Sequence, residues 1–215
     1  MDYVDYQKYP RIYFQEIKTL IMRKLYCFDF DGTITTKDTM FLFLKFCAPF
    51  KFYIRFIQYA PLFILVKLHF ANAEQVKRSF IASILQGYSE EQLQKYSKKF
   101  YQEYKNQIIR SKAVEFFKTI DTNAEAFLVT ASLDIWVKPF ADEFGFGCIA
   151  TRAMYERGIF TGKFATKNCN GKEKVNRIKA EIDTQTYGKR IAFGDTSGDK
   201  EMLAWADEGF YRFFH

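Results

Sequence analysis

The chain has 215 residues, enough for one domain with a smaller insertion. Hydrophobic residues make up 48% and charged residues 27%, a balance that excludes the disordered class. The formal charge of +7 suits nucleic acid, anionic lipid or a small anionic substrate as partner. With only two histidines, His69 and His215, the sequence disfavours a histidine-based triad or a histidine-rich metal site.

The four cysteines are scattered and form no C-x-x-C pair. They are Cys27, Cys47, Cys148 and Cys169. This pattern predicts a reduced, cytoplasmic chain without a disulfide framework or a zinc site. Residues 1–22 carry acids and lack an apolar run, so we expect an N-terminal extension of doubtful function rather than a signal peptide.

A short apolar run at 25–28 predicts a buried strand. Residues 39–70 follow, dense in Phe, Leu and Ile, and we expect Pro49 and Pro61 to interrupt helix there. From residue 73 apolar residues recur at helical spacing, with Ser89 as an N-cap between two helices. The two stripes are Val76, Phe80 and Ile84, then Leu93, Tyr96, Phe100, Tyr104 and Ile108.

Beyond residue 108, apolar runs typical of buried strands alternate with helical patterns. Helices are expected over 114–120, 133–144 and 175–182, strands at 126–129, 148–150, 190–194 and 209–214, and a hairpin at 157–164. This alternation predicts an α/β fold, a Rossmann-like parallel sheet with helices on both faces. The helical block lies between the first two strands. We therefore predict a catalytic core of 23–38 and 109–215 and a helical cap of 39–108.

Three strands of this sheet end in small polar residues. The first strand ends at Asp29-Phe30-Asp31-Gly32, the second at Thr130-Ala131-Ser132, and the fourth at Gly194-Asp195 through Asp199. Ligands of open α/β sheets bind beyond the carboxyl ends of the strands. The sequence therefore predicts one site built from these three ends.

Asp29 and Asp31 are two residues apart, so in an extended segment their side chains point the same way while Phe30 faces the core. Carboxylates brought close together repel each other, and a magnesium ion, with Asp195 as a third ligand, would neutralise them. Gly32 would allow the backbone to approach a phosphate closely.

These motifs resemble the haloacid dehalogenase superfamily of phosphotransferases. "DFDGT" is similar to its first motif, "FLVTAS" to its second and "GDTSGD" to its fourth. A helical cap between the first and second motifs resembles the branch that includes phosphoserine phosphatases and phosphatidylglycerophosphatase C. The resemblance covers nearly the whole chain from Leu25 onward.

The resemblance implies a phosphatase that works through an aspartyl-phosphate. Asp29 would be the nucleophile, and Asp31 would protonate the leaving alcohol and then activate water. Mg²⁺ would be held by Asp29, the Asp31 carbonyl group and Asp195. Thr130 would donate its hydroxyl to a phosphoryl oxygen, and Asp199 would hold a metal-bound water or the site lysine.

The family also uses a lysine between its third and fourth strands to stabilise transition-state charge. "NCNGKEKV" offers Lys172 and Lys174, with Lys167 just upstream. Lys174 is favoured, because "EKV" at the start of a helix resembles the lipid-phosphatase branch. Lys172 remains an alternative.

Two further residues are candidates for substrate contact. Asp38 lies where phosphoserine phosphatases have a substrate-contacting acid, although we favour an N-cap role for it. Arg78 is the available arginine for a substrate carboxylate, but it does not fall cleanly where that branch has its arginine. Ala131 and Ser132 stand where that branch has glycines.

The cap segment points to another substrate class. Between Asp38 and Glu74 there is no acidic residue, and the basic residues there stand among ten aromatic ones. This composition suits an interfacial helix pair at the cytoplasmic face of an anionic bilayer, and it equally suits the core of the cap. We expect a lipid-linked or hydrophobic phosphate as substrate, with phosphoserine or another small metabolite as the alternative.

Two other classes of protein compete with the enzyme. A peripheral membrane module without catalysis would keep the fold and use only the cap. Nucleic-acid binding is not expected, because the lysines are spread over many helices and no recognised motif is present.

Overall fold

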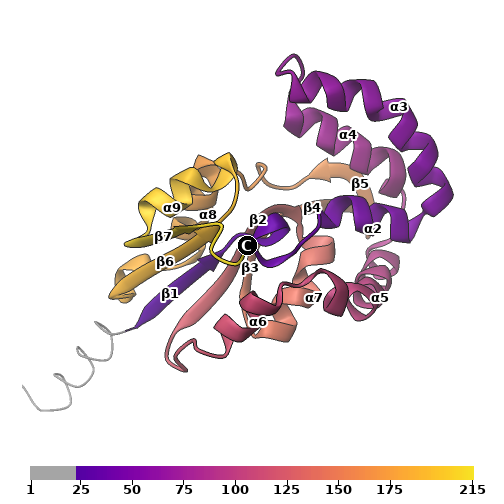
Figure 1. The fold of residues 1–215 in the computed structure, drawn as a ribbon. Helices are drawn as coiled ribbons and strands as arrows, with labels where there is room; N and C mark the ends of the chain where they lie inside the picture. Colours follow the sequence, from indigo (N-terminus) through magenta and orange to yellow (C-terminus); the bar gives the residue numbers. More distant parts are fainter. Residues whose placement is uncertain (1–22) are drawn as a thin grey trace, which may run out of the picture.

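The structure is a computed structural model and describes residues 23–215; the expected N-terminal extension, 1–22, lies outside the described residues. Its centre is a five-stranded parallel sheet in the order β3-β2-β1-β6-β7 (Figure 1). The strands are β1 (Lys24–Phe28), β2 (Glu125–Leu133), β3 (Gly147–Thr151), β6 (Lys189–Gly194) and β7 (Glu208–Tyr211). The predicted strands are thereby confirmed.

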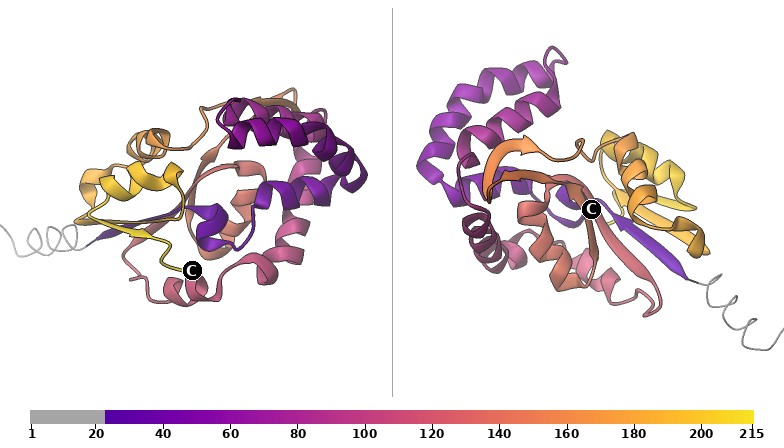
Figure 2. Two further views of the ribbon diagram at one scale, coloured as in Figure 1. Left: turned by 45° about the horizontal axis from the view of Figure 1, so that its top comes forward. Right: turned by 180° about the vertical axis from the view of Figure 1, so that it is seen from behind.

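Helices cover both faces of the sheet, as predicted (Figure 2). Tyr26 and Phe28 of β1 pack into the cluster that includes α6 (Ser111–Phe117) and α7 (Asp134–Phe144). Leu25 and Cys27 face the opposite cluster, with α8 (Lys172–Glu181) and α9 (Lys200–Trp205). Because both faces are buried, β1 is an unbroken apolar run rather than an alternating one.

The helices α2 (Thr39–Cys47), α3 (Pro49–Lys67), α4 (Ala73–Leu85) and α5 (Glu90–Ile108) occupy the range assigned to the cap. Polar side chains fix where three of them begin. The Asp38 carboxylate caps α2, the Asn72 side chain caps α4, and Ser89 forms a capping box with Gln92 at the start of α5. The predicted Ser89 N-cap is confirmed.

The expected interruption at Pro61 is wrong, because α3 continues through this residue to Lys67. Pro49 stands in the first turn of the helix, where proline is favoured. Pro61 removes the N–H that would reach the Ile57 carbonyl group. Both residues are exposed, so water is available to that carbonyl group.

Two isolated strand-like pairings link the cap to the rest of the chain. At the first, Thr35 pairs with Ile109, where the chain enters and leaves the cap. At the second, Ser89 pairs with Ile159 of a hairpin formed by β4 (Ala153–Glu156) and β5 (Ile159–Phe164). Figure 1 shows β5 running beneath α4.

All four cysteines are free thiols. Among the helices of residues 23–215, none combines the length and the apolar character needed to cross a membrane.

Candidate active site

The carboxyl ends of β1, β2 and β6 meet at a cavity of about 380 Å³ between the sheet and the cap. Asp29 follows β1, Thr130 lies in β2, and Asp199 stands five residues after the end of β6; all three line the cavity. Parallel strands in register place these side chains together, as the sequence predicts.

Lys174 lies at the centre of the polar network. Its Nζ donates to Asp29 Oδ1 at 2.5 Å, Asp199 Oδ1 at 2.7 Å and the Val129 carbonyl oxygen at 2.7 Å. The side chain is 1% exposed, so these partners replace water completely. Lys172, the alternative lysine, is exposed at the first position of α8. The geometry therefore brings Lys174 to the site.

The charges of this network depend on one another. Burial alone would lower the pKa of Lys174, but the carboxylates of Asp29 and Asp199 outweigh it and raise that pKa. Burial would raise the pKa of Asp199, yet its ion pair with Lys174 holds the pKa below the usual value. Burial raises the pKa of Asp29 to about 7, even though Lys174 opposes this shift. A further positive charge beside Asp29 would therefore stabilise its ionised carboxylate.

Asp195 meets the first motif through Thr33. The Thr33 hydroxyl lies 3.0 Å from Asp29 Oδ2 and 2.9 Å from Asp195 Oδ1. Gly32 makes this turn with φ of +82°, and a Cβ at that position would overlap the Asp195 carboxylate. Sequence reasoning assigned Gly32 to substrate and overlooked Thr33. The "DGT" triplet was the available signal for a side chain that links the two acids.

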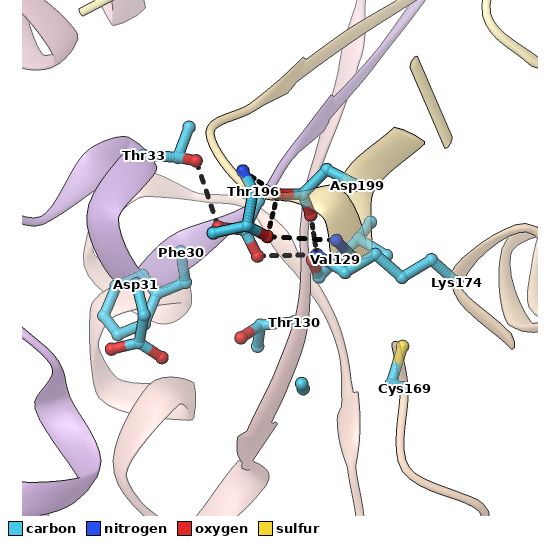
Figure 3. Close-up of polar contacts among 12 residues, drawn as sticks. Phe30, Asp31, Thr33, Val129, Thr130, Cys169, Lys174, Thr196 and Asp199 are labelled. Carbon is cyan, nitrogen blue, oxygen red and sulfur yellow. Dashed lines mark hydrogen bonds and ion pairs between the residues drawn. The ribbon is translucent and has the colours of Figure 1, made fainter. Parts of the chain in front are cut away.

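Asp31 lines the cavity, but its carboxylate has separate partners. Oδ1 accepts from the Thr39 N–H at 2.7 Å and the Thr39 hydroxyl at 2.6 Å, and Oδ2 accepts from the Ser132 hydroxyl. In Figure 3 this carboxylate lies apart from the dashed network around Lys174. The expectation that side-chain oxygens of Asp29, Asp31 and Asp195 converge on one ion is therefore corrected. Strand geometry ends at Phe28, so the period of two does not apply here.

The β2 end supplies hydroxyl and carbonyl groups. Thr130 is 1% exposed, and its Oγ1 accepts from the Ser132 N–H at 3.0 Å. The Ala131 carbonyl oxygen accepts from Nζ of Lys77, a cap residue, at 2.8 Å. Lys77 lines the cavity, and burial lowers its pKa. Sequence reasoning overlooked Lys77.

The other two substrate candidates have different positions. Asp38 caps α2 through Oδ1, as favoured from the sequence, and it also lines the cavity. Arg78 is exposed and is not among the residues that line the cavity. The structure thus does not bring Arg78 to the site; its neighbour Lys77 occupies the cavity wall instead.

The cap side of the cavity is mainly apolar. Its wall consists of Met40, Phe41, Phe63, Val66 and Val76. Carboxylates, two threonines and Lys174 lie on the side nearer the sheet, and Lys77 adds a positive charge from the cap. The cavity thus offers a charged end for an anion and an apolar end for a hydrocarbon group.

The acidic cluster suits a hard divalent cation. Ligand oxygens of Asp29, Asp195 and Asp199 lie within 4.8 Å of one another. Oxygen donors of this kind are the ligands that Mg²⁺ prefers. Asp199 is already engaged, since its second oxygen accepts from the Asp195 and Thr196 N–H groups and the Thr196 hydroxyl. Asp29 and Asp195 retain free lone pairs, so these two carboxylates fit an ion best.

Three comparisons relate this chain to known proteins. The profile of the haloacid dehalogenase-like hydrolases matches residues 27–204. Protein CicA of Caulobacter vibrioides is 34% identical over 193 residues, which cover 88% of this chain and 86% of the relative.

Solved structures share the fold at lower identity. A protein with unknown function from Bordetella pertussis Tohama I superposes with a TM-score of 0.75 and 21% identity, over 86% of this chain and 87% of that one. A phosphoserine phosphatase with a phospho-aspartyl intermediate analogue superposes with a TM-score of 0.56 and 21% identity, over 88% of this chain and 85% of that one. Together with the matched profile, these findings confirm the resemblance of the motifs: the chain belongs to the haloacid dehalogenase-like hydrolase family and has the fold of its phosphoserine phosphatases.

Proposed function

We propose that this protein is a Mg²⁺-dependent phosphomonoesterase that acts through an aspartyl-phosphate on a hydrophobic, lipid-linked phosphate. The observation that carries the proposal is the Asp29 carboxylate, which faces the cavity at the end of β1 with Lys174 at 2.5 Å. A carboxylate next to a fixed cation is placed to attack an anionic phosphate, because the cation offsets their repulsion.

In the first step a carboxylate oxygen of Asp29 bonds to phosphorus, and the bond from phosphorus to the ester oxygen breaks. Asp31 gives its proton to the departing oxygen, so the substrate leaves as an alcohol. The Thr130 hydroxyl and Lys174 stabilise charge on the phosphoryl oxygens. The backbone of Gly32 and Ala131 would lie beside the phosphoryl oxygens.

In the second step water attacks the phosphorus of the aspartyl-phosphate and gives a proton to Asp31. The bond between phosphorus and Asp29 breaks, which releases inorganic phosphate and restores both acids. Thr39 and Ser132 hold the Asp31 carboxylate in place through both steps, because their donors fix its orientation.

The metal ion would be held by Asp29 and Asp195, with Asp199 positioning Lys174 and the turn after β6. When bound, Mg²⁺ would neutralise charge on the nucleophile and the phosphate. We expect chelation to lower phosphate release at least ~10²-fold and added magnesium to restore it. Phosphate release measured before and after metal removal tests this; full activity in excess chelator would reject the metal dependence.

The lipid-linked substrate is proposed from the apolar wall. Phe41, Phe63 and Val66 belong to the apolar wall that the cap contributes to the cavity. A hydrocarbon group placed there is removed from water, which favours binding by about 25 cal/mol per Å² of apolar area.

The experiment that tests the mechanism compares Asp29→Asn with Asp142→Asn, an exposed acid of α7. We expect Asp29→Asn to stop release of phosphate from an aryl phosphate, since an amide is a poor nucleophile. Asp142→Asn should behave as the wild type. Acid-quenched wild-type protein should carry label from a radiolabelled phosphoester. Activity that survives in Asp29→Asn would exclude the aspartyl-phosphate.

Phosphoserine is a second candidate substrate, favoured by the fold shared with phosphoserine phosphatases and by Lys77. This cation lines the cavity and would donate to a substrate carboxylate. Rates measured on phosphoserine and on detergent-dispersed lipid phosphates separate the two candidates.

A further inference from the structure

We propose that the outer face of α3 docks on an anionic lipid bilayer and so presents a lipid phosphomonoester to the cavity. The inference rests on the proposed function and adds to it a partner and a binding surface.

Apolar residues on the outer face of α3 form an exposed line. Phe50, Tyr53, Ile57, Ile64 and Leu68 recur at intervals of three, four or seven, which places them along one side of a helix; we call them the outer stripe. Their exposed fractions run from 52% at Tyr53 to 81% at Phe50. Figure 1 shows α3 at the margin of the cap, with α4 between it and the hairpin. An exposed apolar patch of this extent marks an interaction site.

The opposite side of α3 is packed against the cap. Phe52 is buried, and its ring lies 5.9 Å from that of Phe80 in α4. Phe63 approaches the same Phe80 ring at 5.2 Å. These inner residues form the contact of α3 with the cap core. Of the outer stripe, Tyr53 packs on its neighbours, with its ring 5.6 Å from that of Phe52 and 5.3 Å from Lys45 Nζ, and it still keeps half of its surface exposed.

The segment that carries the stripe is basic, although Lys51 turns inward and donates to the Ile84 carbonyl oxygen at 2.7 Å, and this net charge favours an anionic partner. Residues 39–73 contain Lys45, Lys51, Arg55 and Lys67 and no acid. In a twofold contact between copies, the same basic segments would face each other and repel. A bilayer with anionic headgroups supplies apolar depth and negative charge together, which is the partner of a basic amphipathic helix.

The position of the cavity favours lipid over another protein. Phe63 and Val66, on the inner side of α3, line the same cavity that holds Asp29 and Lys174. One helix thus carries the outer stripe on one side and the apolar cavity wall on the other. A phosphomonoester whose tail lies in the bilayer would reach Asp29 along the wall that Phe63 and Val66 form.

The test is vesicle flotation of the wild-type protein and two variants. The vesicles are phosphatidylcholine alone or phosphatidylcholine with phosphatidylglycerol. Ile57→Glu changes the outer stripe, and Tyr211→Glu places the same charge on a similarly exposed residue of β7. We expect wild type and Tyr211→Glu to bind anionic vesicles more tightly than neutral ones. Ile57→Glu should bind them at least ~10-fold more weakly, since it brings a charge into the interface.

Enzyme assays separate this proposal from the proposed function. Ile57→Glu should cleave a soluble aryl phosphate at the wild-type rate, but should lose at least ~10-fold in rate on phosphatidic acid held in anionic vesicles. Vesicle binding without hydrolysis of either ester would keep the docking surface and reject the proposed function. Hydrolysis of the aryl phosphate without vesicle binding would reject the docking surface and leave the phosphatase activity in place.

Three results would overturn docking. They are absence of wild-type binding to both kinds of vesicle, equal binding by Ile57→Glu, and concentration-dependent dimerisation that Ile57→Glu abolishes while no form binds vesicles. The last would show that a second copy covers the outer stripe.

Discussion

Lys174 is a single cation shared by two buried carboxylates and a carbonyl group. Without it, Asp29 and Asp199 would face each other across a site from which water is excluded. The lysine thus serves both the fold and the proposed chemistry, and a substitution must be read against both.

For Lys174→Met we expect phosphate release to fall at least ~10²-fold, because a donor to the transition-state charge is lost. The free energy of unfolding should fall by about 3–5 kcal/mol, as expected when one partner of a buried pair is removed. Urea unfolding and phosphate release measure the two effects.

Lys172→Met is the matched control, two residues away on the exposed side of α8. It should keep wild-type activity, and its free energy of unfolding should change by no more than about 0.5 kcal/mol. A larger loss of activity in Lys172→Met than in Lys174→Met would reverse the assignment.

The positions of the principal acids could be predicted from the sequence because they depend on strands. Asp29 and Asp195 directly follow apolar runs, and parallel strands end at a common edge. The partners of Asp31 could not, since its carboxylate is oriented by the Thr39 and Ser132 hydroxyls across a turn. A sequence pattern contains no information about such a turn.

At the scale of the element, α4 reaches beyond the cap core with its first turns. Ala73, Val76 and Lys77 line the cavity, whereas Phe80 and Ile84 are in the cap core. Lys77 lies on the same side of α4 as the apolar residues, three before Phe80 and seven before Ile84. A lysine at the centre of an apolar face was the signal that could have identified it instead of Arg78.

Lys77→Met and Arg78→Met form a matched pair. We expect Lys77→Met to raise KM for an anionic substrate about 10-fold, because an ion pair or charged hydrogen bond in the cavity is worth about 1.5–3 kcal/mol. Arg78→Met should leave KM unchanged, since its side chain is exposed and outside the cavity. Steady-state kinetics with both variants provide the measurement. A larger rise in KM for Arg78→Met than for Lys77→Met would assign the binding of the anionic substrate to Arg78.

The course of α3 was harder to predict than that of α4. Apolar residues cover both of its sides, so periodicity does not reveal which side is buried. The choice depends on contacts with Phe41 and Phe80, which lie in other helices. Pro61 predicts an interruption from local sequence alone, and the helix tolerates it because that side of α3 is exposed.

At the scale of the molecule, the cap and the core share one apolar cluster. The Phe43 ring of α2 lies 5.2 Å from that of Trp136 in α7, and the Trp136 indole N–H donates to the Thr39 hydroxyl. The same cluster extends to Phe28 in the sheet. We therefore expect the cap and the core to unfold together.

Buried thiols report on both parts. Cys47 lies in α2 and Cys27 in β1, and burial raises the pKa of both, that of Cys27 to about 12. Neither thiol should react with a disulfide reagent at neutral pH in the folded protein, since the thiolate is the nucleophile. In two variants, one that keeps only Cys47 and one that keeps only Cys27, the remaining thiol should become reactive at the same urea concentration. Earlier reaction of Cys47 would show that the cap unfolds separately.

The overall architecture could be predicted because alternating strands and helices restrict the topology to few choices. The pairing of Ser89 with Ile159 could not, since these residues are 70 positions apart and no short-range pattern connects them.

That pairing fastens the hairpin to the cap. Backbone bonds beside it run from the Gly87 N–H to the Phe160 carbonyl oxygen and from the Glu90 N–H to the Gly158 carbonyl oxygen. A displacement of the cap that widens access to Asp29 must therefore either carry β4 and β5 along with it or break these backbone bonds.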